Sequence, residues 1–323
     1  MTQTVLVGDI GGTNVRFACA HLNLTGAPEI ESVSILPGDS FSSFEAALER
    51  YLDSLNGHRP DHALFAFAGP VREGRVTLTN RNWSVDSTKV ANDLEFDRVR
   101  FVNDYAAMAR AIPVLPESSF KLIHAGDPTK DRAPILVSGP GTGLGVATLL
   151  PEYEGGWHVL TGEGGHAAYA PQTEREWVLA KELRRHYGHV SKELVLSGSG
   201  LNAVHAALCA LDGVPWVKTP PAEILNRARA GDIICRDICR IRAAATLDAM
   251  ADAALINGTR GGVVITGGVA ERLSDWLTAP EALARFFERG PMSHYMHPIP
   301  IRLLLSGQSA LIGAAALHFD QET

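Results

Sequence analysis

Cysteine is scarce in this sequence of 323 residues, which contains only four. Cys19, Cys209, Cys235 and Cys239 do not form the dense framework of a small secreted protein. Cys235 and Cys239 lie four residues apart in a predicted helix, but no nearby second pair completes a tetrahedral zinc site. We therefore expect buried or partly buried thiols rather than a zinc site.

Long hydrophobic runs and basic patches are also missing. No apolar run of 18 residues is present to span a membrane. The start, MTQTVLVGD, lacks the basic segment and apolar core of a signal peptide. The formal net charge is −7, and no stripe of lysine and arginine suggests a nucleic-acid surface. We expect a cytoplasmic protein that acts on small molecules, with neither a membrane nor a nucleic-acid partner.

The length and composition are those of a globular protein with more than one core. Hydrophobic residues make up 46% of the sequence and charged residues 20%. A chain of 323 residues exceeds the size at which a single core usually stops growing, so two domains are expected.

Two common nucleotide-binding motifs are absent. The sequence has neither GxxxxGKS nor GxxxxGKT, and residues 139–145 miss the GxGxxG pattern because Leu144 occupies the last glycine position. Both the Walker-type and the dinucleotide-binding interpretations are therefore weakened.

Two glycine-rich turns are nevertheless present, each between two apolar runs. In residues 4–20, Asp9 is followed by Gly11, Gly12, Thr13 and Asn14; residues 134–150 contain Gly139, Gly141, Thr142 and Gly143. Glycine lets backbone amides approach an anion closely. Each segment predicts a strand, a phosphate-binding turn and a second strand. The alternative for either turn alone is an ordinary hairpin.

Residues 100–112, RFVNDYAAMARAI, place Asn103 and Asp104 where an apolar strand gives way to a helix. The first turn of a helix has unpaired N–H groups and partial positive charge, which keeps a carboxylate there ionised and ready to accept a proton. Asp104 is thus a candidate general base. The alternative is a helix N-cap, a position that Asn and Asp favour.

The remaining periodicity predicts strands and helices in two series. Helices are expected at 41–55, at 174–187 with Thr173 and Glu176 as a capping box, at 200–213 and at 232–257. A strand at 263–266 runs into Gly267 and Gly268, and a terminal helix is expected at 309–319. Glu193 lies two residues after Ser191 and can be explained as part of the first turn of a helix that Ser191 caps.

Seven ordered blocks give the chain a resemblance to a known family along nearly its whole length. They are GDIGGTNVR at 8–16, LTNRNW at 78–83, FVNDYAAMARAIP at 101–113, SGPGTGLGVA at 138–147, TGEGGHAAYAP at 161–171, GHVSKELVLSGSGL at 188–201 and ITGGVAERL at 265–273. The chain resembles the glucokinase family of bacterial hexokinases, within the actin-like sugar kinase superfamily.

The resemblance implies an α/β protein with a duplicated actin-like, ribonuclease H-like ATPase fold and two domains separated by an interdomain cleft. The small domain would comprise residues 1–112 plus about 307–323, and the large domain residues 113–306. The resemblance also implies a homodimer.

The resemblance further implies ATP-dependent phosphorylation of the 6-hydroxyl of glucose, with Asp104 as the base. The sugar hydroxyls would be bound by Asn103, Asp104, Glu163, His166 and Glu193. The nucleotide would be bound by Asp9, Gly11, Gly12, Thr13, Asn14, Gly139, Gly141, Thr142, Gly143, Gly267 and Gly268. Mg²⁺ would arrive with ATP and be held by Asp9 through water, because magnesium usually keeps several waters.

Other functions remain open at this point. A related hexose kinase would differ only in its sugar preference, and a non-catalytic sugar-sensing regulator would keep the same fold. A chaperone-like or acyl-phosphate-forming ATPase would keep the phosphate turns without the sugar residues. A neighbouring family of kinases and repressors usually carries a cysteine-rich zinc motif after its GEGGH-like loop, where this chain has YAPQTEREW.

Overall fold

The protein is described by a computed structural model that covers residues 4–78, 82–127, 132–153, 155–305 and 307–320. Contacts within the chain divide it into two compact units. The first unit comprises residues 1–119, 152–161 and 306–323, and the second comprises 120–151 and 162–305. The predicted functional domains are residues 1–112 plus about 307–323, and residues 113–306. This division stays a prediction. Residues 79–81 of the LTNRNW block lie outside the described residues.

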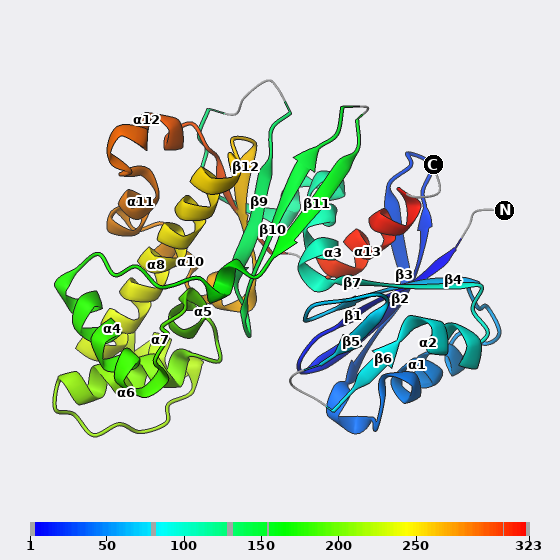
Figure 1. Cartoon of the computed structure of the whole chain (residues 1–323), viewed down its shortest axis with the longest axis horizontal. Coiled ribbons are helices and arrows are strands. Elements are labelled where there is room, and N and C mark those ends of the chain that lie inside the picture. Colours follow the sequence, from blue (N-terminus) through cyan, green and yellow to red (C-terminus); the bar gives the residue numbers. More distant parts are fainter. Residues whose placement is uncertain (1–3, 79–81, 128–131, 154, 306, 321–323) are drawn as a thin grey trace. The chain divides into compact units, whose positions relative to one another are not determined.

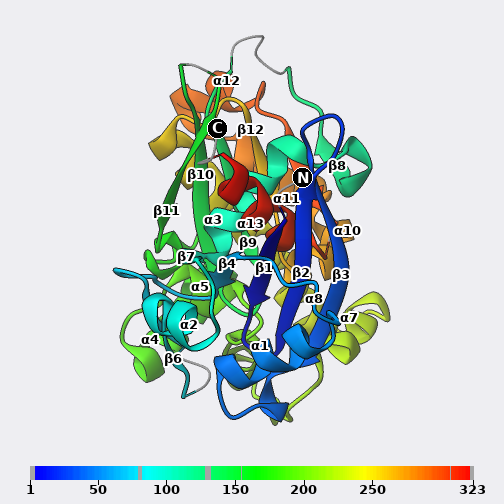
Figure 2. The ribbon, with the colours of Figure 1, turned by 90° about the vertical axis from the view of Figure 1, so that its right-hand side faces the viewer.

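The first unit contains a five-stranded sheet in the order β3-β2-β1-β4-β7 (Figure 1). Its strands are β1 (Val5–Ile10), β2 (Asn14–Leu22), β3 (Pro28–Pro37), β4 (His62–Phe67) and β7 (Arg98–Asn103). Strands β1, β2 and β3 are antiparallel neighbours, as Figure 2 shows, whereas β1, β4 and β7 run parallel. The carboxyl ends of the three parallel strands therefore meet at one edge of the sheet.

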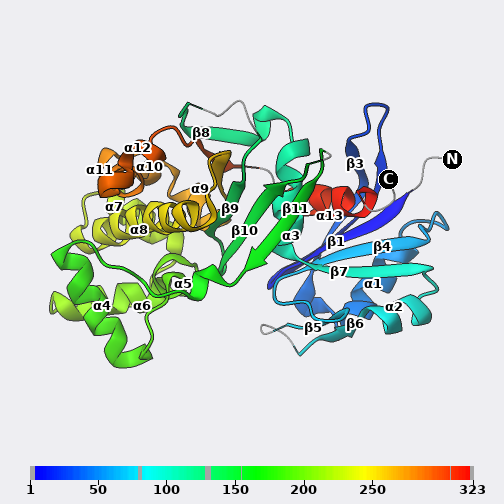
Figure 3. The same ribbon diagram turned by 45° about the horizontal axis from the view of Figure 1, so that its top comes forward.

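Alternation along the strands produces a buried core on both faces of this sheet. In β1, Leu6 and Ile10 pack on the face covered by α1 (Phe44–Asp53) and α2 (Ser87–Asp93). Val5 and Val7 pack on the opposite face, against α3 (Asp104–Ala111) and α13 (Ser309–Phe319). Figure 3 shows the two helix pairs on opposite sides of the sheet.

Helix α13 holds α3 in place by close backbone packing. A Cβ on Gly313 would collide with the carbonyl oxygen of Ala107, so only glycine permits this approach. Arg110 adds two hydrogen bonds to the carboxylate of Asp320, at 2.6 and 2.7 Å. The helix that begins at Asp104 is consequently fixed on two sides, by the sheet and by α13.

A second, six-stranded sheet has the order β11-β10-β9-β12-β13-β8, and all of its strands except β11 lie in the second unit. Its strands are β8 (Phe120–His124), β9 (Ile135–Pro140), β10 (Leu144–Pro151), β11 (Trp157–Gly162), β12 (Gly262–Ile265) and β13 (Ile301–Leu304). Strands β9 and β10 form an antiparallel hairpin, and β9, β12 and β13 run parallel. This is the arrangement of β1, β2, β4 and β7, with β8 added at one edge, so the predicted duplicated α/β fold is confirmed.

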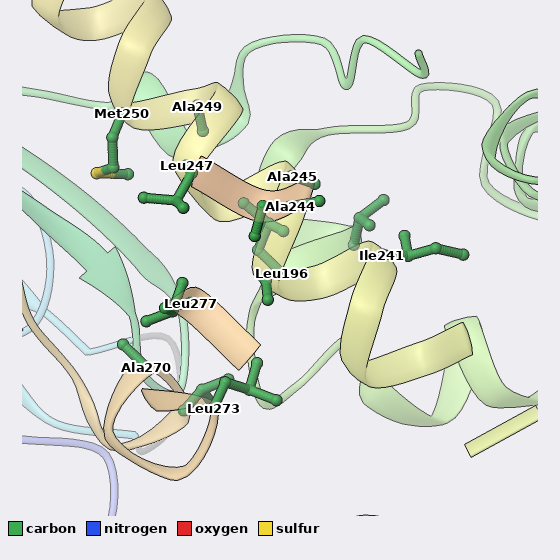
Figure 4. Packing of buried hydrophobic residues seen from close by; sticks show 14 of the residues in the cluster. Leu196, Ile241, Ala244, Ala245, Leu247, Ala249, Met250, Ala270, Leu273 and Leu277 are labelled. Carbon is green, nitrogen blue, oxygen red and sulfur yellow. The ribbon is translucent and has the colours of Figure 1, made fainter. Parts of the chain in front are cut away.

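The helices of the second unit surround α8. They are α4 (Glu174–Tyr187), α5 (Lys192–Leu196), α6 (Leu201–Leu211), α7 (Pro221–Arg229), α8 (Ile233–Asn257), α9 (Gly268–Arg272), α10 (Ser274–Leu277), α11 (Pro280–Phe287) and α12 (Ser293–Met296). Figure 4 shows Leu196, Leu273 and Leu277 near the buried face of α8. The predicted helices at 174–187, 200–213 and 232–257 are confirmed, whereas α7 and α10–α12 were not predicted.

Short elements complete the fold. They are the hairpin of β5 (Arg75–Thr77) and β6 (Ser84–Asp86) and the 3₁₀ turns η1 (Gly38–Ser40), η2 (Ile112–Val114), η3 (Glu117–Ser119), η4 (Gly164–His166) and η5 (Gly290–Met292). All four cysteines are buried and free, as expected. In the described part of the chain, no helix combines the length and apolar character needed to cross a bilayer.

Candidate active site

In the first unit, the parallel strands bring the first glycine turn and the Asn103–Asp104 pair to the same edge. The register pairs Ile10 with Phe67 and Phe67 with Asn103, so β1, β4 and β7 end level with one another. The Nδ2 group of Asn103 donates to the carbonyl oxygen of Gly69, 3.1 Å away, in the loop that follows β4. The ends of all three strands thus form one polar edge.

The first glycine turn connects β1 and β2, as the sequence predicts. The N–H of Gly11 donates to the carbonyl oxygen of Asn14 at 3.1 Å, and the N–H of Gly38 donates to that of Thr13 at 3.0 Å. Thr13 is exposed at the tip of the turn. Gly11 does not adopt a positive φ, and a Cβ there would lie 3.5 Å from the carbonyl oxygen of Asn14. Its backbone conformation does not require glycine.

Asp9 is the charged residue of β1. Its Oδ2 accepts a hydrogen bond from Nη1 of Arg16 at 2.6 Å, across the β1–β2 pair. Burial raises the pKa of the Asp9 carboxyl above its ordinary value, although the charge and hydrogen bond of Arg16 act in the opposite direction. The fold thus keeps a carboxyl group where its ionised form is disfavoured by burial.

Asn103 and Asp104 lie at the strand-to-helix junction that the sequence predicts. Asn103 ends β7 and caps α3, because its Oδ1 accepts from the N–H of Tyr105 at 3.0 Å. Asp104 is the first residue of α3, and its Oδ1 accepts from the same N–H at 2.9 Å. The capping role proposed as the alternative is therefore correct for Asn103. Asp104 lies at the positive end of α3, where the helix dipole stabilises a carboxylate.

In the second unit, the second glycine turn connects β9 and β10. The N–H of Gly141 donates to the carbonyl oxygen of Gly143 at 2.9 Å. The carbonyl oxygens of Gly141 and Thr142 accept from Gly198 and Ser199, at 2.8 and 3.2 Å. Both turns therefore expose a threonine between two antiparallel strands, as expected for two copies of one element.

Gly267 brings the β12–α9 turn directly against the second glycine turn. It adopts a φ of +96°, and a Cβ there would lie 2.5 Å from the carbonyl oxygen of Pro140. A Cβ on Gly139 would likewise collide with the backbone of Thr266. Close packing explains both glycines. Gly268 comes directly after Gly267 and is the first residue of α9.

The loop that contains Glu163 and His166 is fixed by backbone contacts. Gly165 lies so close to the carbonyl oxygen of Leu144 in β10 that a Cβ would collide with it. The ring Nε2 of His189 donates to the carbonyl oxygen of His166 at 2.9 Å. Glu163 and His166 themselves are exposed, so their polar groups are accessible to a ligand.

Glu193 lies in the first turn of α5, and Ser191 caps that helix by accepting from the N–H of Leu194 at 3.1 Å. The structural explanation offered for Glu193 is therefore correct. Its Oε2 also accepts from the N–H of Leu144, 2.8 Å away, at the end of the second glycine turn. Glu193 thus connects α5 to that turn, and η4, α5 and β10 contact one another.

A small apolar pocket of about 60 Å³ lies beside this group. Its lining includes Gly198, Leu201, Ile238, Cys239, Val269 and Leu273. Gly198 contacts the second glycine turn, and Val269 follows Gly268. Sequence reasoning missed this pocket, because its residues come from distant segments and each matches an ordinary core pattern.

The carboxylates of the chain determine how Mg²⁺ could be held. Within the described ranges, no group of three or more His, Cys, Asp or Glu side chains is arranged to hold a metal ion. A magnesium ion that keeps several waters and is carried by phosphates needs only one or two protein carboxylates. Asp9, in the strand that leads into the first glycine turn, fits that requirement.

The two similar sheets give the chain the actin-like ATPase fold of sugar kinases. The glucokinase family model matches residues 6–321, so the chain belongs to the glucokinase family. A glucokinase of Chromobacterium violaceum is 40% identical over 312 residues, which cover 96% of this chain and 88% of the relative. A glucokinase of Nitrobacter hamburgensis is 37% identical over 99% of this chain and 98% of the relative.

Solved structures agree with the fold. The crystal structure of a glucokinase from an Antarctic psychrotroph is 33% identical, covers 99% of this chain and 100% of its own, and has a TM-score of 0.87. The glucokinase of Balamuthia mandrillaris, solved in complex with glucose, is 20% identical, covers 98% of this chain and 93% of its own, and has a TM-score of 0.82. At that lower identity the likeness concerns the fold alone.

Proposed function

We propose that the chain is a glucokinase that transfers the γ-phosphoryl group of ATP to the 6-hydroxyl of glucose, with Asp104 as the general base. Membership of the glucokinase family supports the reaction. The observation that carries the residue assignment is the level ending of β1, β4 and β7, which brings Asp104 to the edge that also holds the first glycine turn. A base and a phosphate-binding turn are two of the parts that phosphoryl transfer needs.

Asp104 accepts the proton of the sugar hydroxyl as that oxygen attacks phosphorus. Its place in the first turn of α3 stabilises the carboxylate, because the helix N-terminus carries partial positive charge. Asn103 is held by Tyr105 and Gly69 and contributes a side-chain amide beside the base. General base catalysis of this kind typically contributes about 10²- to 10⁴-fold to the rate.

The remaining sugar contacts come from Glu163, His166 and Glu193. Carboxylate and imidazole groups hydrogen-bond hydroxyls, and an analogue that lacks one hydroxyl leaves its protein partner unpaired. The exposed side chains of Glu163 and His166 extend from a loop that is fixed by its backbone. A rigid loop with accessible polar groups suits the recognition of a rigid pyranose ring.

The nucleotide is bound by the glycine turns. The amides around Gly11–Asn14 and Gly139–Gly143 interact with phosphate oxygens, and the turn of Gly267 and Gly268 contacts the adenosine. Asp9 holds Mg²⁺ through water. When bound, the ion neutralises phosphate charge.

A product assay with several sugars and donors tests this function. Formation of sugar phosphate is measured with glucose, mannose, glucosamine and fructose, each with ATP, ADP or polyphosphate. Glucose with ATP is expected to give the highest kcat/KM. Faster turnover of another hexose would identify a related hexose kinase, and glucose binding without turnover with any donor would favour a sugar-sensing regulator.

We also propose that the enzyme works in the cytoplasm, as a homodimer, and supplies glucose 6-phosphate to glycolysis. The family resemblance supports this proposal. Sedimentation equilibrium at micromolar concentration tests the assembly, and a mass equal to one chain would contradict the dimer.

A further inference from the structure

A continuous chain of charged and polar side chains runs through the second unit. Its members contact one another in the order Tyr169, Glu176, Arg285, Asp248, Arg289, Asp252 and Lys192. The successive distances are 2.7, 2.8, 3.6, 2.8, 3.3 and 2.6 Å. We call these seven residues the charge chain.

The two ends of the charge chain lie on two backbone segments that are paired with each other. Ala168 and Ser191 form an antiparallel bridge. Beside it, the N–H of Tyr169 donates to Val190 at 2.9 Å and the N–H of Lys192 donates to Ala167 at 2.8 Å. Tyr169 and Lys192 thus lie on the two strands of one small backbone bridge, each next to one of the bridged residues.

This bridge joins the proposed sugar ligands. The segment before Tyr169 contains Glu163 and His166, and the residue after Lys192 is Glu193. Any rotation or shift of the bridge would move all three side chains together. The charge chain connects both halves of the bridge to helices: Tyr169 reaches Glu176 in α4, and Lys192 reaches Asp252 in α8.

The charge chain is balanced and largely buried. Three cations face three carboxylates, and Glu176, Arg285, Asp248 and Arg289 are mostly shielded from solvent. Burial opposes ionisation of Glu176, yet hydrogen bonds from Arg285 and Tyr169 hold the pKa of its carboxyl below the ordinary value. Buried ionic networks add little net stability compared with apolar packing, but they specify one geometry.

We propose that Tyr169 and Lys192 are positioning residues for sugar recognition. The charge chain holds Glu163, His166 and Glu193 in the positions from which they contact the hexose. The proposal rests on the glucokinase function proposed above. It predicts that weakening either end of the chain impairs glucose recognition more than ATP recognition. All three sugar residues depend on the bridge, whereas the second glycine turn also keeps its backbone hydrogen bonds to Gly198 and Ser199.

Two conservative variants test the proposal. Tyr169→Phe removes only the hydroxyl that donates to Glu176, and Lys192→Met removes the charge that faces Asp252. Each is expected to raise the glucose KM about three- to tenfold with the ATP KM within about twofold of wild type. Lys192→Arg keeps the charge and is expected to recover most of the loss.

A matched control separates positioning from general destabilisation. Arg175, in α4, makes two hydrogen bonds of 2.7 Å to Asp212 and one of 2.8 Å to Asp237, and neither partner belongs to the bridge or to the charge chain. Arg175→Met therefore loses ionic contacts of similar geometry in the same unit. It is expected to lower Tm without raising the glucose KM.

The double variant gives a further readout that a purely structural role would not produce. Because both ends belong to one chain, Tyr169→Phe and Lys192→Met together should raise the glucose KM by less than the product of the single effects. A glucose KM in both single variants that matches Arg175→Met would overturn the proposal. Wild type that phosphorylates no hexose would instead contradict the proposed function, so the two failures are distinguishable.

Discussion

Glu193 and Leu144 connect the proposed sugar site to the second glycine turn, because the Oε2 of Glu193 accepts the N–H of Leu144 at 2.8 Å. A Cβ on Gly143 would lie 2.7 Å from the same oxygen, so the carboxylate packs tightly against the turn. One side chain is therefore placed to affect both substrates.

Replacing Glu193 in two ways separates these effects. Glu193→Gln keeps an oxygen that can accept from Leu144 but loses the charge, so the glucose KM should rise about 10- to 100-fold with little change in the ATP KM. Glu193→Ala also leaves the Leu144 N–H without this acceptor and should raise both constants. Steady-state kinetics with each substrate varied in turn provides the measurement. Equal changes in both constants for Glu193→Gln would argue against the sugar contact.

The glycines of the second turn differ in a way that gives a second prediction. A Cβ on Gly141 would have no heavy atom closer than 4.0 Å, and its φ is not positive, so the fold tolerates a side chain there. Neither Gly11 nor Gly141 has a positive φ, so only a close approach of the backbone to phosphate would require glycine at these positions. Gly141→Val should raise the ATP KM at least about tenfold, because the side chain occupies space meant for phosphate, and leave Tm nearly unchanged.

Gly139→Ala is the control for Gly141→Val. Its Cβ would collide with the backbone of Thr266, so this variant should lower Tm even without nucleotide. If Gly141→Val leaves ATP kinetics unchanged, the second turn does not bind phosphate.

Asp9 gives a prediction about stability and pH. Burial raises the pKa of Asp9 in the folded protein above its value in the unfolded chain. Protonation of Asp9 therefore favours the folded state. This contribution to stability is fully present below the pKa of the unfolded state and is lost as the pH rises through the pKa of the folded state. At pH 7 the ionised carboxyl is therefore unfavourable to folding. Asp9→Asn should have a Tm equal to or above that of wild type at pH 7, and this difference should narrow as the pH falls toward about 4.

The same variant should lose activity. If Asp9 holds Mg²⁺ through water, Asp9→Asn should lower kcat/KM for ATP at least about tenfold, although the fold is not weakened. Thermal denaturation between pH 4 and pH 8, together with kinetics at pH 7, measures both effects. Full activity in a more stable Asp9→Asn protein would contradict the metal role.

Local patterns in the sequence were sufficient to predict much of the architecture. Both glycine turns join the predicted strands, and the junction at Asn103 and Asp104 lies where the apolar run changes its period. These features depend on residues a few positions apart, whose propensities agree with the final fold. The duplicated order of the two sheets was inferred from resemblance and is confirmed by the strand pairing.

Long-range ionic partners could not be predicted in this way. Thr173 and Glu176 indicated a capping box, and Thr173 does cap α4, but Glu176 also contacts Tyr169 and Arg285, which lies 109 residues further along the chain. Arg242 interrupts the apolar stripe of α8, where it donates to the buried carbonyl oxygens of Val195, Leu196 and Ser197. Such contacts depend on how helices pack, which no local period records.

The roles of the site residues stay predictions, and Asp104 carries the most weight among them. Asp104→Asn keeps the size of the side chain and an oxygen that can accept from Tyr105, but it removes the capacity to take up a proton. Glucose binding should therefore be largely kept while chemistry fails. The fold of the variant is checked by its Tm, which should lie close to that of wild type.

The most direct measurement is the rate of glucose 6-phosphate formation by wild type and Asp104→Asn at saturating ATP and glucose, with the glucose Kd of both measured by calorimetry. The account predicts that wild type forms glucose 6-phosphate, that kcat of the variant falls by about 10²- to 10⁴-fold, and that the glucose Kd changes by less than about threefold. Turnover of the variant at the wild-type rate would contradict the assignment of Asp104 as the base.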